Sequence, residues 1–117
     1  MPSFKQGDVV KVPFPYTDRS TRQFRPALVA STGGIEAAHG LLWVVIITSA
    51  GNRRWPGDVT VGNLDMAGLP IPSVIRTAKI ATIEAADAEK LGKVPRALFG
   101  QVAGHLAREL GLASRER

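Results

Sequence analysis

The chain has 117 residues, a length that suits a single domain, and 44% of them are hydrophobic, which is enough for one modest core. Because it contains no cysteine, a disulfide framework, thiolate metal ligands and thiol catalysis are excluded. The net charge is +5, and residues 1–83 hold 9 of the 15 basic but only 5 of the 10 acidic residues. This basic part of the chain favours either a polyanionic partner or plain solubility.

No stretch of the sequence is suited to crossing a membrane, since the longest apolar run covers only Leu41 to Thr48. The first residues, MPSFKQGD, lack the apolar segment of a signal peptide. No repeat or linker divides the chain. We therefore expect a cytoplasmic protein without membrane contact, folded as one domain over residues 1–117.

The first two thirds of the sequence predicts short strands. Residues 41–49, LLWVVIITS, give the strongest signal, because a nearly continuous β-branched run is typical of a central strand buried on both faces. Further strands are predicted at residues 8–14, 27–31, 57–61, 73–76 and 79–83. Glycine and proline clusters at 33–34, 50–52, 56–57 and 68–72 mark the turns between them.

The hydrophobic period changes near residue 95. Apolar residues then recur at helical spacing, at Leu98, Phe99, Val102, Leu106 and Leu110. A second, shorter helix is predicted over residues 85–91. Strands followed by helices indicate an α+β fold, a small β-barrel or sandwich with a helical tail.

Residues for ordinary catalytic chemistry are sparse. The two histidines, His39 in a predicted loop and His105 on the predicted helix, belong to no metal-binding motif. No serine lies in a nucleophile elbow, and the glycines form no phosphate-binding motif. We therefore expect neither a metal ion nor a cofactor.

Arginine is the main chemical resource of the chain. Five arginines lie in two predicted loops: Arg19, Arg22, Arg25, Arg53 and Arg54. A guanidinium stays charged and offers paired donors that match phosphate oxygens. Three aromatic residues lie beside them: Tyr16, Phe24 and Trp55. Rings next to cations suit single-stranded nucleic acid, although the pattern fits ordinary solvated loops equally well.

Two residues stand out by position. Arg25 directly precedes Pro26 and a predicted strand. Its backbone is therefore expected to be held more rigidly than that of a residue in a mobile loop. Thr48 ends the strongest strand, where its hydroxyl would emerge at the rim of the sheet. A threonine at this position serves either for its strand propensity alone or as a hydrogen-bonding group.

Taken together, these stretches resemble the MazF/PemK family of toxin–antitoxin endoribonucleases. The order and spacing of several short pieces carry the resemblance. They are GDVV at 7–10, VPFP at 12–15, Thr17-Asp18, RPALV at 25–29, VVIIT at 44–48, SVIR at 73–76, Lys79-Ile80, Thr82-Ile83 and Leu91-Gly92.

The resemblance implies an SH3-like β-barrel of the CcdB/MazF type with a C-terminal helix, usually as a homodimer. It implies metal-independent cleavage of single-stranded RNA, with Arg25 and Thr48 as the catalytic residues and 2′,3′-cyclic phosphate and 5′-OH ends as products. A cognate antitoxin, whose acidic tail occupies the RNA groove, is the implied protein partner. The residues expected to contact RNA are Arg19, Arg22, Phe24, Ser49, Asn52, Arg53 and Arg54.

Two other functions fit a chain of this type. The same fold class includes toxins that bind DNA gyrase, and a related chain could bind RNA without cleaving it. The Arg25 and Thr48 pair favours the nuclease, because a gyrase-binding toxin has no need of it.

Overall fold

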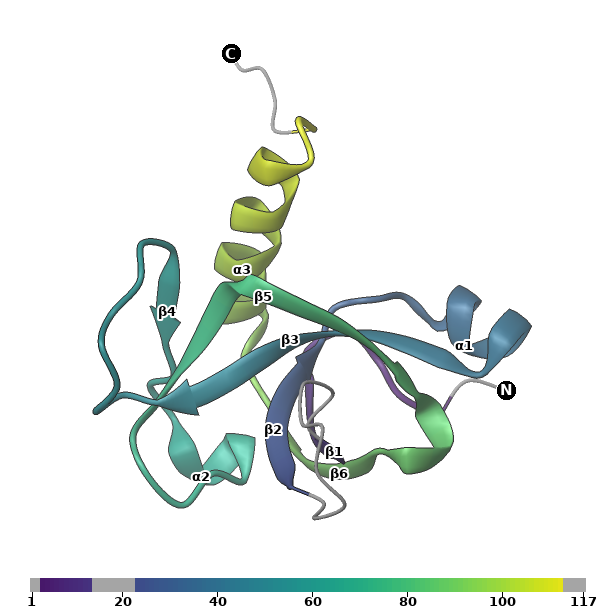
Figure 1. Ribbon diagram of the computed structural model, residues 1–117, viewed down its shortest axis with the longest axis horizontal. Helices are drawn as coiled ribbons and strands as arrows, with labels where there is room; N and C mark the ends of the chain where they lie inside the picture. The colour runs from purple at the N-terminus through teal and green to yellow at the C-terminus, as the bar shows by residue number, and fades with distance from the viewer. Residues whose placement is uncertain (1–2, 14–22, 113–117) are drawn as a thin grey trace.

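The computed structural model describes residues 3–13 and 23–112, which fold into one curled antiparallel sheet with a C-terminal helix beside it (Figure 1). The strand order in the sheet is β4-β5-β3-β2-β1-β6. The elements are β1 (Asp8–Pro13), β2 (Phe24–Val29), α1 (Gly33–His39), β3 (Leu41–Ser49), β4 (Asp58–Thr60), α2 (Leu64–Ala67), β5 (Ser73–Glu84), the 3-10 turn η1 (Ala85–Asp87), β6 (Glu89–Lys93) and α3 (Arg96–Glu109). The predicted α+β class and C-terminal helix are confirmed.

The strands predicted from composition are present, with different bounds. β2 starts at Phe24, three residues earlier than expected, because residues 24–28 pair with β1. The two predicted strands at 73–76 and 79–83 are one bent strand, β5, whose register with β3 shifts between Val45 and Ile47. β3 lies between β2 and β5, as its apolar run predicts.

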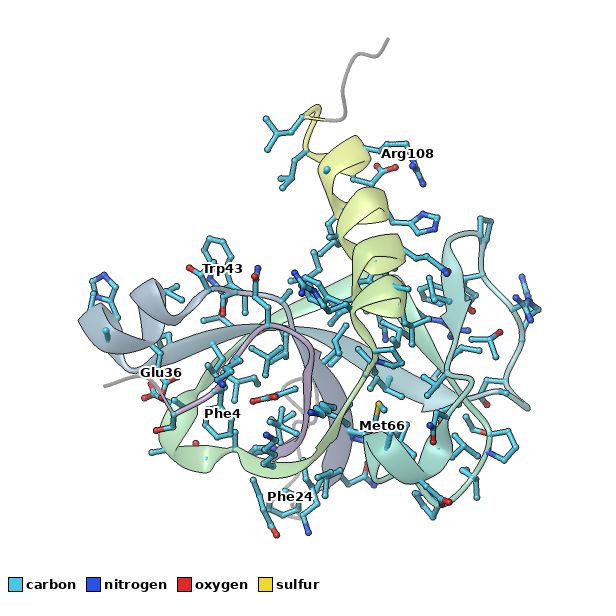
Figure 2. The ribbon with its side chains drawn as sticks, turned by 180° about the vertical axis from the view of Figure 1, so that it is seen from behind. Phe4, Phe24, Glu36, Trp43, Met66 and Arg108 are labelled. Carbon is cyan, nitrogen blue, oxygen red and sulfur yellow. The ribbon has the colours of Figure 1, made fainter. Side chains whose placement is uncertain are left out.

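Two assignments from the sequence were wrong, and one short helix was missed. Residues 85–91 are not a helix: they form η1 and then most of β6, since pairing with β1 satisfies backbone groups that a seven-residue helix would satisfy poorly. Helix α1 replaces the expected loop around His39, and the carboxylate of Glu36 accepts the backbone N–H groups of Ser3 and Phe4 at 2.8 and 3.1 Å (Figure 2). The short helix α2 was also not predicted.

Both faces of the sheet centre are buried. On one face Val9, Leu28 and Val45 pack with α3, whose Val102 is fully buried. On the other face Val10, Ala27, Val44 and their neighbours form a second cluster. Because successive side chains alternate between faces, burial of both explains why β3 is apolar almost throughout.

The sheet does not close on itself by strand pairing, since the order runs from β4 at one edge to β6 at the other. Helix α2, which follows β4, instead packs against β6. The contact is backbone to backbone: a Cβ on Gly92 would overlap the chain at Met66 and Ala67, and one on Gly68 would overlap Leu91. The closed SH3-like barrel expected from the resemblance is therefore not confirmed.

We predict that Gly92→Ala destabilises the protein by about 1–3 kcal/mol, because the added methyl must push α2 away from β6. The measurement is the free energy of unfolding in urea. Gly100→Ala is the matched control: Gly100 lies in α3 with no atom near its would-be Cβ, so this variant should be more stable by up to about 1 kcal/mol. Equal stability of the two variants would contradict the close α2–β6 contact.

Candidate nucleic-acid interface

The pairing of β2 with β3 sets the relative position of Arg25 and Thr48. The register runs through Ala27–Ile46, Leu28–Val45 and Val29–Val44. Arg25 and Thr48 lie two residues beyond the Ala27–Ile46 pair, on strands whose side chains alternate between the two faces of the sheet. Both side chains are partly buried, and both belong by alternation to the face away from α3. Alternation thus places these two residues on one face of the sheet, and their catalytic role stays a prediction.

Asn52 is joined directly to Thr48. Its side-chain amide donates to the Thr48 hydroxyl oxygen at 2.6 Å. The same turn is held by the Ser49 hydroxyl, which accepts the Gly51 N–H, and by the Asn52 N–H, which donates to the Ser49 carbonyl. With its oxygen occupied as an acceptor, the Thr48 hydroxyl keeps its own proton to donate elsewhere.

The other predicted RNA-contacting residues are more dispersed. Arg19 and Arg22 lie outside the described residues, as do Tyr16 and Asp18. Arg53 and Arg54 are exposed in the segment that links β3 to β4. Strand alternation places Phe24 and Ser49 on the face opposite to Arg25, where Phe24 lies 5.8 Å from the Lys11 ammonium group.

Next to this segment lies an ion pair that the sequence analysis missed. The Arg76 guanidinium bonds the Asp58 carboxylate twice, Nε to Oδ1 at 3.2 Å and Nη2 to Oδ2 at 2.9 Å. Arg76 is 7% exposed and the Asp58 side chain 1%. Asp58 and Arg76 each lie within a predicted strand, at 57–61 and 73–76, but nothing in the sequence pairs one with the other.

The ion pair also holds the chain before β4. Arg76 Nη2 donates to the carbonyl of Arg53 at 2.7 Å, and its guanidinium lies 4.2 Å from the Trp55 ring. Asp58 Oδ2 accepts the Trp55 N–H at 3.0 Å. Residues 55–58 form a turn closed by the Asp58 N–H on the Trp55 carbonyl, with Pro56 second and Gly57 third at φ 91°. The turn predicted from Pro56-Gly57 is thus present.

Burial disfavours ionisation of Asp58, but the bonds from the Arg76 side chain and the Trp55 backbone outweigh it. Together with the positive charges of Arg76 and Arg54, they hold the pKa of Asp58 below its ordinary value of 3.8. In the folded protein Asp58 is therefore a carboxylate at neutral pH, fully committed to this cluster.

A separate apolar groove of about 680 Å³ lies on the α3 side of the sheet. Its lining includes Trp43, Ile80, His105, Leu106 and Leu110. Trp43 is 53% exposed, Ile80 51% and Leu110 71%, which is unusual for side chains of this size. Figure 2 shows Trp43 beside α3, on the half of the molecule away from Phe24.

Within residues 3–13 and 23–112, His, Asp and Glu side chains form no cluster of three or more that would hold a metal ion. In the same part of the chain, no helix is both long and apolar enough to span a bilayer.

Comparison with known proteins identifies the class. Residues 5–110 match the family model for the PemK-like, MazF-like toxin of type II toxin–antitoxin systems. The match covers most of the sequence, so the chain belongs to this toxin family, as the sequence resemblance predicted. No curated protein sequence matches it closely enough to be considered a relative.

Solved structures of MazF toxins share the fold at low sequence identity. MazF in a MazE–MazF complex from Deinococcus radiodurans has a TM-score of 0.75 at 24% identity, over 93% of this chain and 97% of that one. An endoribonuclease bound to its cognate antitoxin, from a mycobacterial species, has 0.72 at 22%, over 98% and 100%. The Mycobacterium tuberculosis toxin MazF-mt6 has 0.71 at 18%, over 92% and 99%.

We predict that Asp58→Asn lowers the free energy of unfolding by about 1–3 kcal/mol at neutral pH, because it leaves Arg76 buried without its charged partner. A lowered pKa stabilises the fold above the unfolded value of 3.8, and this stabilisation is lost as pH falls through the folded pKa. The difference between wild type and variant should therefore shrink below pH 3.8. Urea unfolding across this range is the measurement, and a difference independent of pH would contradict an ionised Asp58.

Proposed function

We propose that this chain is the toxin of a type II toxin–antitoxin pair and acts as a metal-independent endoribonuclease on single-stranded RNA. Membership in the MazF-like family supports the toxin role. Two of the similar structures are described as endoribonucleases, which supports the activity. The observation that supports the proposal is the β2–β3 pairing, which ends two residues short of Arg25 and Thr48 and, by alternation, leaves both side chains on one face of the sheet.

The chemistry needs few protein groups, because RNA supplies its own nucleophile. The 2′-OH attacks the adjacent phosphorus, the bond to the 5′-oxygen breaks, and the products carry a 2′,3′-cyclic phosphate and a 5′-OH. The protein must hold the phosphate in line and neutralise the charge that builds on it. Arg25 supplies that positive charge from strand β2, which pairs with β1. Thr48, whose hydroxyl oxygen accepts from Asn52, donates a hydrogen bond from the same hydroxyl to a phosphate oxygen.

The strand-linking segment extends the binding surface. Arg53 and Arg54 are exposed there and provide charge for neighbouring phosphates, while Asn52 connects this segment to Thr48. Arg19 and Arg22, and any contacts of Phe24 or Ser49 with RNA, belong to the same proposal. Because the surface is basic, the proposed antitoxin presents acidic residues to it, and complexes of similar toxins with antitoxins support such a partner.

We predict that Arg25→Ala lowers the rate of RNA cleavage by at least about 10²-fold, since it removes the main electrostatic stabiliser of the transition state. Purified protein is incubated with a long single-stranded RNA in EDTA, and the new ends are sequenced. Wild type should cut and leave 2′,3′-cyclic phosphate ends. Thr48→Val, which replaces the hydroxyl by a methyl group, should also lower the rate of RNA cleavage.

Arg96→Ala is the matched control for Arg25→Ala. It also removes one positive charge, but from an exposed position at the start of α3. It should cleave RNA at nearly the wild-type rate. Cleavage by wild type that stops in EDTA, or cleavage that survives Arg25→Ala, would refute the proposed mechanism.

We also infer that the toxin forms a homodimer through the apolar groove on the α3 side. The groove exposes Trp43, Ile80 and Leu110 next to one another around a concave surface, and burial of such side chains drives association. A second copy covering this face leaves the face of Arg25 and Thr48 open to RNA.

We predict that Ile80→Asp weakens dimerisation by at least about tenfold, because a carboxylate would be buried in an apolar contact. Light scattering at several protein concentrations measures the molar mass. Ile71→Asp is the control, since Ile71 is 50% exposed, almost the same as Ile80, but does not line the groove. A wild type that stays monomeric at high concentration would refute the dimer.

A further inference from the structure

We propose that the buried Asp58–Arg76 pair is a positioning device for RNA binding: it holds residues 50–57 so that the Arg53, Arg54 and Trp55 side chains face the substrate. The inference rests on the proposed function and goes one step further, because neither residue of the pair was assigned to the site. Asp58 and Arg76 would touch no RNA themselves, since both side chains are more than nine-tenths buried.

The contacts of the pair are aimed at the backbone of this segment. Arg76 Nη2 donates to the Arg53 carbonyl at 2.7 Å, and Asp58 Oδ2 accepts the Trp55 N–H at 3.0 Å. The two residues that flank Arg54 are therefore both fixed by their main chain. Their side chains are left exposed, as a binding surface requires.

The Trp55 ring is held by the same device. The Arg76 guanidinium lies 4.2 Å from the ring centroid, and the Lys79 ammonium group lies 5.8 Å from it. Cations attract an aromatic face, so the ring is fixed in orientation while 37% of the residue stays exposed. A fixed, partly exposed indole is a surface on which an RNA base can stack.

Strand pairing places the device next to the proposed catalytic residues. Thr48 pairs with Val74, and Arg76, two residues further along β5, pairs with Asp58. Because residues two apart on a strand share a face, the ion pair and Thr48 lie on the same face of the sheet, one ladder step apart. Asp58, at the end of the segment, and Thr48, just before it, thus lie on the same side of the sheet, away from α3, with β5 between them.

The experiment uses a variant in which the change of charge and the loss of positioning have opposite effects on the affinity for RNA. Asp58→Asn makes the protein more basic by one unit, so charge alone predicts tighter RNA binding. Loss of positioning predicts weaker binding. We expect the Kd for a fluorescein-labelled single-stranded RNA oligonucleotide to rise by roughly tenfold, the scale of losing one well-placed contact. Binding is measured in an Arg25→Ala background so that the RNA stays intact.

Glu89→Gln is the matched control. It raises the charge by the same unit at an exposed carboxylate that pairs with Lys11 at 3.6 Å, on the far edge of the sheet. It should leave the Kd unchanged or lower it slightly. Asp58→Asn binding as tightly as Glu89→Gln, with circular dichroism showing both folded, would overturn the positioning role.

A second measurement needs no RNA. Trypsin cuts after arginine, and Arg53 and Arg54 are exposed but held by the pair. Arg76→Lys keeps the charge but cannot bond Asp58 twice and the Arg53 carbonyl as well. We expect cleavage after Arg53 or Arg54 to be at least about fivefold faster in Arg76→Lys than in Lys90→Arg, a control on β6, under native conditions.

The two measurements separate the possible failures. If wild type cleaves no RNA and the Arg25→Ala protein binds none, while Arg76→Lys is cut faster by trypsin, the proposed function fails and the segment is still held by the pair. If wild type binds RNA and trypsin cuts both variants at the same rate, the positioning inference fails alone. A double-variant cycle adds a readout that a stability effect would not move. Arg54→Ala should weaken binding in wild type and have less effect in Asp58→Asn, whereas additive losses would count against positioning.

Discussion

The antiparallel register between β2 and β3 is the constraint on which the rest of this structure depends. It pairs Ala27 with Ile46 and so decides which side chains at the centre of the sheet meet in the core and which meet at its rim. A slip by one residue would turn every side chain of one strand to the other face. The fully buried valines and leucines on both faces make that slip costly, since each loses most of its burial. The same burial therefore fixes the face on which Arg25 and Thr48 lie, two residues beyond the last paired residues.

A buried ion pair is an expensive way to hold a loop. Removing two charges from water costs several kcal/mol, and a well-packed apolar pair often stabilises a fold as well or better. Stability alone therefore explains the Asp58–Arg76 pair poorly. What an apolar pair lacks is directional bonding to the Arg53 carbonyl and the Trp55 N–H. These bonds fix the backbone of an exposed segment that has little packing of its own, and a binding surface benefits from that fixed geometry.

The elements predicted correctly are those in which the apolar spacing of the sequence matches the buried positions of the structure. β3 and α3 follow from the apolar run at 41–49 and the helical spacing after residue 95, because packing on the core reinforces the local preference. The failures are short segments decided by distant partners. β6 forms because β1 offers it a paired edge, and α2 forms where Gly68 and Gly92 allow two backbones to meet. For the site, the family resemblance and the arginine composition supplied candidate residues, and their roles stay predictions. The Asp58–Arg76 pair could not be predicted, because its 18-residue separation becomes a contact only through the β4–β5 register.

The two contacts proposed for this protein, self-association and RNA binding, place opposite demands on the curled sheet. Self-association needs an apolar surface, and RNA binding needs a basic, hydrated one. Strand alternation separates these surfaces residue by residue: Trp43 and Val45 belong to the α3 side, while Thr48, Asp58 and Arg76 belong to the other. β5, like β3, contributes to both faces, since its bend carries Arg76 on one side and presents Thr77 and Ala78 to the groove on the other. The Thr77 hydroxyl donates to the Gly57 carbonyl at 2.9 Å. Gly57 belongs to the same 55–58 turn in which the Asp58 carboxylate accepts the Trp55 N–H. Residues 55–58 would therefore lie between the dimer contact and the RNA contact. Association at the groove would then affect the segment that is proposed to bind RNA.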